Sequence, residues 1–483
     1  MTTSELCYLS AHEALERFRA RTLSPVELVE ALIVRHEEVG ARINATTILY
    51  HERALKLARK AEERYARPGA RLRRLEGVPV MIKDLHPIKG ELNPQSCRIF
   101  AQDVATDTLP TVERLLRAGA IPLARSTSSE LGIPTVCTGA LWGVTRNPWN
   151  LAMSSGGSSG GSGAALAAGL TPIADGSDFG GSLRIPASAC GVFGYKPPFG
   201  RNPQDRGGVF ESYLHYGPMS RSVADSALMQ NVMSGLHPHD LTTLRERVVV
   251  PHQAGSIKGW KIAVSMDLGY KRVDPDVRRA TRHAAQVFRD LGCTVEDVDL
   301  GWTAETFRAW EVRSKTLVAH MLGPYLPRWR HELLKDSVRD VEEGRTFTID
   351  DLLDGRPIRA AMWMKLSPIL SRHNLLLCPT LALPSVPADH SIFDDEVVIE
   401  GQRVEPYVGW CLTYPFNSLG QLPVASVPSG VAANGVPTGV QLVGRPFDDV
   451  SVFRAALAYE AAFPWLRPGK TPMPDFRDPN LRC

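Results

Sequence analysis

The chain has 483 residues, of which 43% are hydrophobic and 22% charged, an ordinary composition for a folded globular protein. This length suits about two or three average domains, or one large α/β domain with insertions. The net charge of +3 at pH 7 is far from the basic patterning of a nucleic-acid-binding protein, and the apolar runs are too short to span a bilayer.

The N-terminal sequence and the cysteines indicate the compartment. The first 18 residues have no positive segment followed by an apolar one, so they do not form a secretory signal. The eight cysteines stand singly, with no CxxC pair, which argues against a disulfide framework or a zinc site. We therefore expect a cytoplasmic protein with no metal and no cofactor.

The first 67 residues predict a helical segment packed on the core. Apolar residues recur at three- and four-residue spacing in 9–20, 24–43 and 45–67. Ser10 and Ser24 are placed as N-caps, and Pro25 takes the first helical position, where its missing N–H costs nothing. We expect residues 68–483 to form the α/β domain that follows.

From residue 75 on, strand and helix patterns alternate, which predicts a largely parallel sheet with helices on both faces. Residues 302–370 interrupt this order with a helical insertion that could cover a site, and it contains Trp302, Trp310, Trp329 and Trp363. The other expected elements are strands at 75–85, 121–126, 259–267, 294–300, 373–381, 423–430 and 438–446, and helices at 108–120, 278–292 and 450–463.

Residues 154–186 are rich in glycine and serine, which admits three interpretations. A flexible linker has this composition, but ordered-looking sequence lies tight on both sides. A Walker phosphate loop needs a lysine after its last glycine, and none is present. A loop that carries a nucleophilic serine needs a base to take the proton of the hydroxyl.

Two residues are candidates for that base. His86 belongs to no recognisable triad, and we interpret it as a partly exposed loop histidine. Lys83 lies in the apolar stretch VPVMIKDL, where burial would favour its neutral form. Ser–Lys pairs replace histidine on several folds, although a strand-end lysine could equally pair with Asp84.

Several motifs together resemble the amidase signature family. They are GVPVMIKDL, GVTRNPWN, GGSSGGSGAALAAGL, DGSDFGGSLRIPASACGVFGYKP, GPMSRSVAD, YPFNSLGQLPVASVPSG and GVPTGVQLVGRPFDD, and the resemblance covers roughly residues 8–465. It implies an α/β fold with a large, twisted, mixed central sheet covered by helices on both faces. It implies a hydrolase of amide C–N bonds, with carbamates, urethanes and some esters as further substrates.

The resemblance assigns roles residue by residue. Ser182 would be the nucleophile, Ser158 the bridging serine at a cis peptide bond, and Lys83 the base. The main-chain N–H groups of Phe179, Gly180, Gly181 and Ser182 would form the oxyanion hole, with Ser159, Asp178 and Arg184 as supporting residues. The chain departs from the family pattern at Ser155, at 93–97, at Ser126–Thr127 and at Phe179, which indicates an unusual substrate preference.

The substrate and the partners are less defined. Aromatic residues that could line the substrate pocket are Trp142, Phe179, Tyr213, Tyr216 and Trp410, although ordinary core packing explains each equally well. We expect a small-molecule amide or carbamate as the only ligand, no nucleic acid and no membrane span, and the resemblance makes a homodimer reasonable.

Two alternatives stay open. A glutamine-hydrolysing amidotransferase subunit typically has Gln where this chain has Ile185, and the stretch 206–219 lacks that branch's FxSSLDxxGP pattern. A catalytically inactive scaffold homologue would not need Lys83, Ser158 and Ser182 together.

Overall fold

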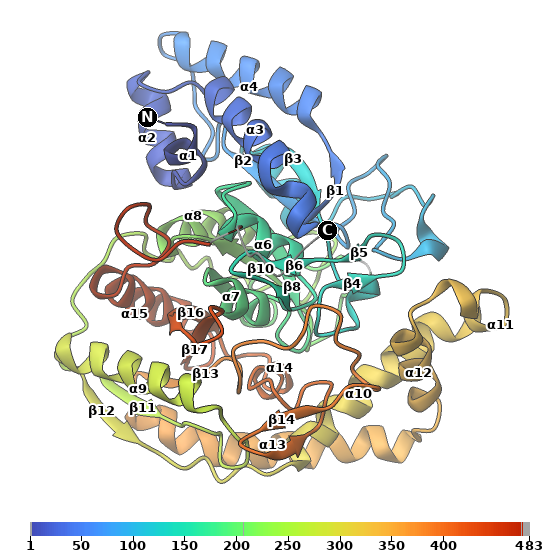
Figure 1. The fold of residues 1–483 in the computed structure, drawn as a ribbon. Coiled ribbons are helices and arrows are strands. Elements are labelled where there is room, and N and C mark those ends of the chain that lie inside the picture. The colour runs from blue at the N-terminus through green and yellow to red at the C-terminus, as the bar shows by residue number, and fades with distance from the viewer. Residues whose placement is uncertain (1, 206, 475, 477–483) are drawn as a thin grey trace.

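A computed structural model describes residues 2–205, 207–474 and 476. In this part of the chain eleven strands form one central sheet (Figure 1). Their order across the sheet is β1 (Thr46–Leu49), β3 (Ile121–Ser126), β2 (Pro79–Lys83), β8 (Ile173–Asp178), β10 (His215–Ser220), β9 (Phe193–Lys196), β16 (Val424–Val431), β17 (Pro437–Gly444), β13 (Leu375–Pro379), β11 (Lys261–Val264) and β12 (Thr294–Asp297).

The sheet is mixed, as the family resemblance implied, so the expectation of a largely parallel sheet was wrong. Strands β2, β3 and β8 run parallel, and so do β11, β12 and β13. The strands between these two groups pair antiparallel. A short turn joins β16 to β17, and only antiparallel neighbours can be connected in this way.

Both faces of the sheet are covered. Along β13 the residues alternate between two hydrophobic clusters, with Leu375 and Leu377 in one and Leu376 and Cys378 in the other. Successive side chains of a strand point to opposite faces, so the two clusters lie on opposite sides of the sheet. Helices α9 (Pro275–Asp290) and α15 (Asp449–Ala462) contribute to the first cluster, and α10 (Glu305–Leu322) and α13 (Ile349–Arg372) contribute to the second.

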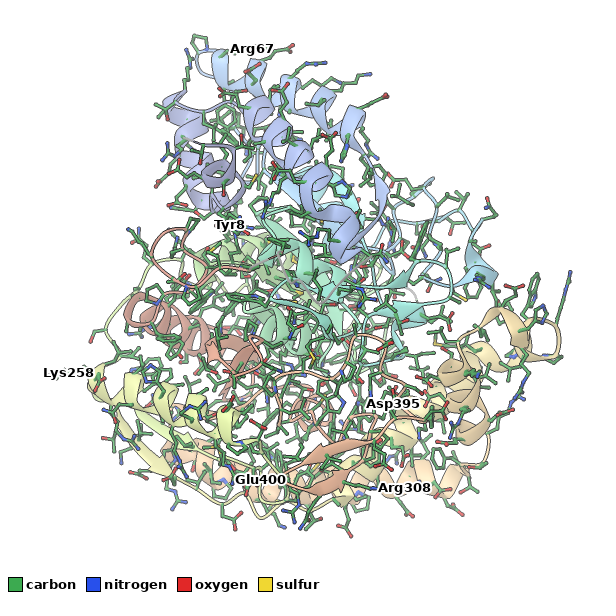
Figure 2. The ribbon with its side chains drawn as sticks, in the orientation of Figure 1. Tyr8, Arg67, Lys258, Arg308, Asp395 and Glu400 are labelled. Atoms are coloured by element: carbon green, nitrogen blue, oxygen red, sulfur yellow. The ribbon has the colours of Figure 1, made fainter. Side chains whose placement is uncertain are left out.

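The N-terminal helices are α1 (Thr3–Cys7), α2 (Ala11–Ala20), α3 (Pro25–Ile43) and α4 (His51–Ala66). Ser10 and Ser24 form capping boxes, which confirms both predicted N-caps. The stretch TTIL before α4 is strand β1 rather than helix, because its β-branched residues pair antiparallel with β3. Tyr8 lies where these helices meet the core (Figure 2), and its hydroxyl donates to the main-chain O of Ala167 at 3.0 Å.

The predicted insertion contains helices joined by short turns, and none of the described strands lies in it. Helices α10, α11 (Leu326–Trp329), α12 (Lys335–Gly344) and α13 lie together, coloured yellow to orange in Figure 1. The division of the chain at residue 67 stays a prediction. Among the described residues, no helix combines the length and the apolar character that a membrane crossing requires.

Shorter elements complete the fold. The remaining helices are α5 (Pro110–Arg117), α6 (Gly160–Ala167), α7 (Arg184–Cys190), α8 (Val223–Met233) and α14 (Pro415–Ser418). Small two-stranded sheets pair β4 (Thr138–Gly139) with β5 (Gly143–Val144), β6 (Arg146–Asn147) with β7 (Asn150–Ser154), and β14 (Val397–Ile399) with β15 (Gln402–Val404).

Candidate active site

Lys83 is the last residue of β2, and its side-chain nitrogen lies among three serine hydroxyls. Nζ is 2.7 Å from Oγ of Ser158, 2.9 Å from Oγ of Ser159 and 3.0 Å from Oγ of Ser177. Ser158 and Ser159 precede α6, and Ser177 lies on β8, the neighbour of β2. The structure therefore brings the predicted lysine and the predicted bridging serine within hydrogen-bonding distance.

Burial changes the protonation of Lys83. The side chain is completely buried, and burial lowers the pKa of its ammonium group to about 7. Cys137, Asp175 and Asp178 act in the opposite direction, because negative charge favours the ammonium form. A lysine with this pKa is uncharged in a large fraction of molecules at neutral pH, and its lone pair can then accept a proton.

Asp84 does not pair with the Lys83 side chain. Its Oδ2 accepts hydrogen bonds from the main-chain N–H of Ser96 at 2.7 Å and from Nε1 of Trp142 at 3.3 Å. The interpretation of Lys83 as one half of an ordinary strand-end ion pair is therefore wrong.

The serine segments at 158–159 and at 182 are joined through the main chain. The N–H of Ser159 donates to the O of Ser182 at 3.3 Å, and the peptide bond between Gly157 and Ser158 is cis. Ser158 and Ser182 both line one cavity of about 520 Å³, and Ser182 is partly exposed to it. The two predicted serines thus open onto the same space.

In the loop after β8, as far as the structure describes the chain, the main-chain carbonyl groups are hydrogen-bonded, whereas the main-chain N–H groups are not. The main-chain O atoms at 178, 179, 180 and 182 each accept a hydrogen bond from a distant part of the protein, and that of Gly181 accepts from the N–H of Ile185 at 2.7 Å. Within the described residues, the N–H groups from position 179 to 182 donate to no protein acceptor. A row of fixed, unpaired N–H groups beside a serine can bind a negatively charged oxygen.

The two glycines of this loop are required by close packing. Gly181 has a φ of 132°, and a Cβ there would lie 2.1 Å from Oγ1 of Thr413. A Cβ on Gly180 would lie 2.7 Å from the indole ring of Trp310. No side chain fits at either position, so the glycines allow the neighbouring side chains to pack directly against the loop backbone.

Asp178 lies at the start of this loop and Arg184 follows its end, and the two side chains form a buried ion pair. Nε of Arg184 donates to Oδ2 of Asp178 at 2.9 Å, and a terminal nitrogen donates to Oδ1 at 2.8 Å. Burial acts to raise the pKa of Asp178, but the charge and hydrogen bonds of Arg184 hold it well below its usual value. Arg184 also donates to the main-chain O of Thr413 at 2.9 Å and to Oε1 of Gln441 on β17 at 2.7 Å, so the pair ties this loop to the C-terminal part of the chain.

The cavity is lined mainly by apolar and aromatic side chains. Helix α10 contributes Trp310, Leu317, Val318 and Met321, and Tyr216 and Phe179 come from β10 and from the loop after β8. Of the residues that the sequence placed at the substrate pocket, Tyr216 and Phe179 line it.

The other three predicted pocket residues lie outside the described lining. Trp142 donates to Asp84, and Trp410 is completely buried with its Nε1 3.2 Å from the main-chain O of Pro406. Tyr213 does not line the cavity, and its ring stacks on that of Phe179 with the two ring centroids 5.6 Å apart. Their position at the pocket is thus corrected: the rings of Tyr213 and Trp410 pack into the core, and the partly exposed Trp142 hydrogen-bonds Asp84 outside the lining.

Sequence reasoning missed two polar groups at this site. Ser177 hydrogen-bonds Lys83, and its place two residues after Asp175 on a buried strand could have indicated that both side chains lie on the same face of the sheet. His86 is only 1% exposed, so its interpretation as a partly exposed loop residue was wrong. Its Nδ1 lies 2.7 Å from Oδ2 of Asp175.

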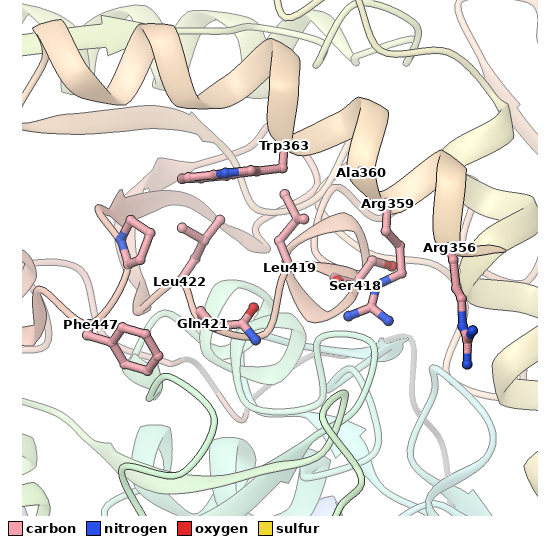
Figure 3. A pocket seen from close by; sticks show the side chains of 10 residues that line it. Arg356, Arg359, Ala360, Trp363, Ser418, Leu419, Gln421, Leu422 and Phe447 are labelled. Carbon is pink, nitrogen blue, oxygen red and sulfur yellow. Dashed lines mark hydrogen bonds between the residues drawn. The ribbon is translucent and has the colours of Figure 1, made fainter. Parts of the chain in front are cut away.

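A second depression lies apart from these residues, between α13 and the loops at 418–422 and 446–447 (Figure 3). Trp363, Leu419, Leu422 and Phe447 form its apolar part, and two arginines of α13 lie at one end of the row of side chains that the figure draws. None of the predicted catalytic residues lines it, so the cavity at Ser158 and Ser182 is the candidate active site.

The chain is similar to known amide hydrolases over nearly its whole length. Residues 27–453 match the family model described as Amidase. An acylamidase from Rhodococcus erythropolis is 34% identical over 472 residues, which cover 96% of this chain and 98% of that protein. A glutamyl-tRNA(Gln) amidotransferase subunit from Geobacter metallireducens is 30% identical over 492 residues, which cover 95% of this chain and 98% of that protein.

A solved structure is similar in fold as well. The crystal structure of a bacterial aryl acylamidase of the amidase signature family superposes with a TM-score of 0.89 at 29% identity, and covers 95% of this chain and 97% of that one. The mixed sheet and these relatives define the class: this is a hydrolase that acts on amides. The chain belongs to the amidase signature family.

Proposed function

We propose that this amidase hydrolyses aryl amides, in which an aromatic amine leaves, through an acyl-enzyme on Ser182 with Ser158 and Lys83 as the proton relay. The observation that carries the proposal is the 2.7 Å hydrogen bond between Nζ of Lys83 and Oγ of Ser158, in a site where burial brings the pKa of the lysine to about 7. A buried neutral lysine can activate a hydroxyl as histidine does in other serine hydrolases.

The chemistry balances with these groups alone. Lys83 takes the proton of Ser158 while Ser158 takes that of Ser182, and the freed Oγ of Ser182 attacks the amide carbon. The proton returns along the same path to the amide nitrogen, the C–N bond breaks and the amine leaves. Water then attacks the ester of Ser182 by the same relay and releases a carboxylic acid.

The unpaired N–H groups at 179–182 supply the oxyanion hole in this proposal. The negative oxygen of the tetrahedral intermediate would accept from them, and each such donor is typically worth about 3–4 kcal/mol in the transition state. Their carbonyl groups are already bound, so the loop needs no rearrangement when the charge develops.

The cavity supports an apolar or aromatic substrate. Trp310, Phe179 and the aliphatic residues of α10 form an apolar wall beside the polar Ser314 and His320 of the same helix, and this wall suits an anilide better than a small hydrophilic amide. Two relatives with similar sequence or fold are an acylamidase and an aryl acylamidase. Helix α10 would form part of a cover over the bound substrate.

The amidotransferase alternative is less well supported. Ile185 lines the cavity and is 1% exposed, so an apolar side chain lies where that branch typically has glutamine. Hydrolysis of carbamates, urethanes and esters, a cytoplasmic location and a homodimer stay predictions from the sequence.

Hydrolysis of a small substrate panel tests the proposal. Purified wild type and Ser182→Ala are assayed with a p-nitroanilide, acetanilide, a primary aliphatic amide, an aryl carbamate and glutamine. We expect wild type to cleave the anilides fastest and Ser182→Ala to cleave none of the panel. Glutamine hydrolysis without anilide hydrolysis would favour the amidotransferase, and inactivity on all substrates together with resistance to a fluorophosphonate would favour the scaffold.

A further inference from the structure

A buried carboxylate joins the two ends of the turn that follows β2. Asp175 lies on β8 and is completely buried. Its Oδ1 accepts a hydrogen bond from the main-chain N–H of Lys83 at 2.7 Å, and its Oδ2 lies 2.7 Å from Nδ1 of His86. The main-chain N–H of His86 in turn donates to the main-chain O of Lys83 at 2.9 Å. Asp175 thus holds both residues of the turn from the neighbouring strand.

This contact replaces main-chain pairing. The register of β2 against β8 runs through Val80–Ile173 and Met81–Ala174 and ends there. Beyond that point the carboxylate of Asp175 takes the N–H of Lys83, so a side chain fixes the strand end from which the lysine projects. A shift of Asp175 would therefore move Lys83 relative to the serines.

His86 is oriented by the same carboxylate. A carboxylate only accepts hydrogen bonds, so the proton lies on Nδ1 of the imidazole, which donates to Oδ2 of Asp175. The ring is 1% exposed, and its Nε2 has no hydrogen-bond partner within the described ranges. Its other ring contact is edge-to-face with Tyr216 at 5.2 Å.

The strand on the other side of β2 holds the same turn. Arg125 on β3 donates to the main-chain O of His86 at 2.6 Å and to that of Asp84 at 3.1 Å. Since β2 lies between β3 and β8, hydrogen bonds with both neighbouring strands hold the turn after Lys83.

We propose that Asp175 and His86 are a positioning pair for Lys83: they fix the lysine against Ser158, and the charge of Asp175 sets how readily Lys83 releases its proton. This inference rests on the proposed function of Lys83 as the base.

The charges around Lys83 single out Asp175. Burial lowers the pKa of Lys83, while Cys137, Asp175 and Asp178 raise it. Asp178 is neutralised by its ion pair with Arg184, and burial raises the pKa of the Cys137 thiol. Asp175 is held by an N–H group and an imidazole rather than by a guanidinium, so its charge acts on Lys83 with less compensation.

Asp175→Asn tests the electrostatic half of the proposal. The amide keeps an oxygen for the N–H of Lys83 but loses the charge, so Lys83 becomes easier to deprotonate. The acid limb of kcat/KM against pH should move to lower pH by roughly 0.5–1 pH unit. The kcat at the optimum should fall by roughly 10- to 100-fold with little change in KM, because the lysine is less well placed.

His86 variants test the positioning half. His86→Phe keeps a ring at the cavity lining but removes the donor to Asp175, and it should lower kcat by about 10-fold with a smaller change in KM. His86→Asn places an amide N–H near the original Nδ1 and should restore most of that loss. Equal activity of wild type and His86→Phe, or equal losses in His86→Phe and His86→Asn, would overturn this half.

Asp225→Asn is the matched control, since Asp225 is a buried carboxylate that accepts two main-chain N–H groups far along the chain from Lys83. It should lower stability without moving the acid limb. Lysine side-chain NMR, with Lys83 assigned through Lys83→Met, follows its titration independently of turnover. If the titration midpoint of Lys83 is unchanged in folded Asp175→Asn, the positioning proposal is wrong while the proposed function stands. If wild type cleaves no amide, the proposed function itself is wrong.

Discussion

Trp310 and Phe179 are joined by a hydrogen bond between helix α10 and the loop that ends at Ser182. Nε1 of Trp310 lies 3.1 Å from the main-chain O of Phe179, and the indole ring also covers Gly180 closely enough to exclude a Cβ there. The helical insertion therefore contacts the proposed oxyanion hole directly. A residue that walls the cavity also holds the loop that would stabilise the transition state.

Trp310→Phe separates these two roles, because it keeps an aromatic wall but removes the N–H donor. We expect kcat for an anilide to fall by about 10-fold with a smaller change in KM, since the oxyanion N–H groups become less fixed. Steady-state kinetics on acetanilide checks this. Leu317→Ala, at another α10 residue of the cavity that has no hydrogen-bonding side chain, should instead raise KM. The same kcat in Trp310→Phe and wild type would show that the hydrogen bond has no catalytic role.

The ion pair of Asp178 and Arg184 should be essential for stability. Arg184→Met leaves a buried carboxylate without its partner, which costs about 3–5 kcal/mol of unfolding free energy. The pKa of Asp178 is lower in the folded than in the unfolded protein. The ion pair therefore contributes its full stabilisation above the unfolded pKa, and this contribution is lost as the pH falls toward the folded pKa. Urea unfolding at pH 7 measures the loss.

The control for this prediction is an exposed pair. Arg308 on the outer side of α10 (Figure 2) pairs with Asp351 at 2.7 Å. Arg308→Met should cost less than about 1 kcal/mol. Comparable losses of unfolding free energy in Arg184→Met and Arg308→Met would contradict the prediction that the buried pair stabilises the fold more than the exposed one.

The activity of wild type should depend on pH through Lys83. The relay needs a neutral lysine, and burial brings the pKa of this lysine to about 7. kcat/KM should therefore rise with pH through a midpoint near 7 to a plateau above it, and fall about tenfold per pH unit well below it. A pH profile on a p-nitroanilide between pH 5 and 9 checks this, and full activity at pH 5 would exclude Lys83 as the base.

Asp340 predicts a pH-dependent stability of the helical insertion. Burial raises the pKa of this α12 carboxyl to about 7, and neither of its oxygens has a hydrogen-bond partner in the described part of the chain. The folded pKa exceeds the unfolded one, so the native state loses stability as the pH rises through that range, and the cost is complete above pH 7.

Asp340→Asn removes this cost. Its Tm should exceed that of wild type by about 2–4 °C at pH 8 and by clearly less at pH 5, because the cost builds up between the unfolded and the folded pKa; thermal unfolding at the two pH values measures the difference. Asp336→Asn is the control, because Asp336 accepts hydrogen bonds from Ser391 and Ile392 and its loss should destabilise at both pH values. A Tm difference for Asp340→Asn that is the same at pH 5 and pH 8 would contradict the prediction.

Much of the fold was predictable from local patterns, but the neighbouring strands β8, β10 and β9 were not. The capped helices after Ser10 and Ser24 and the apolar strand that ends at Lys83 have clear periodicity. Strand β8, Ile173–Asp178, is buried at every position and contains Gly176 and three polar residues, so it carries no alternation. Its partners across the sheet, rather than its own sequence, make it a strand.

The candidate site divides in the same way. Lys83, Ser158 and Ser182 could be named because their motifs resemble a family, and the structure brings them to one cavity. The hydrogen bond from Trp310 could not be predicted, because it joins positions 131 residues apart through tertiary packing. The same holds for His86, whose burial depends on a carboxylate 89 residues along the chain.

Mass spectrometry of the covalent adduct tests the central claim most directly. Wild type is incubated with a fluorophosphonate, which traps an activated serine, and the modified peptide is sequenced. The account predicts one adduct on Ser182, its absence in Ser182→Ala, and slow labelling in Lys83→Met, with thermal unfolding as the check that this variant is folded. An adduct on another residue, or undiminished labelling of Ser182→Ala, would contradict it.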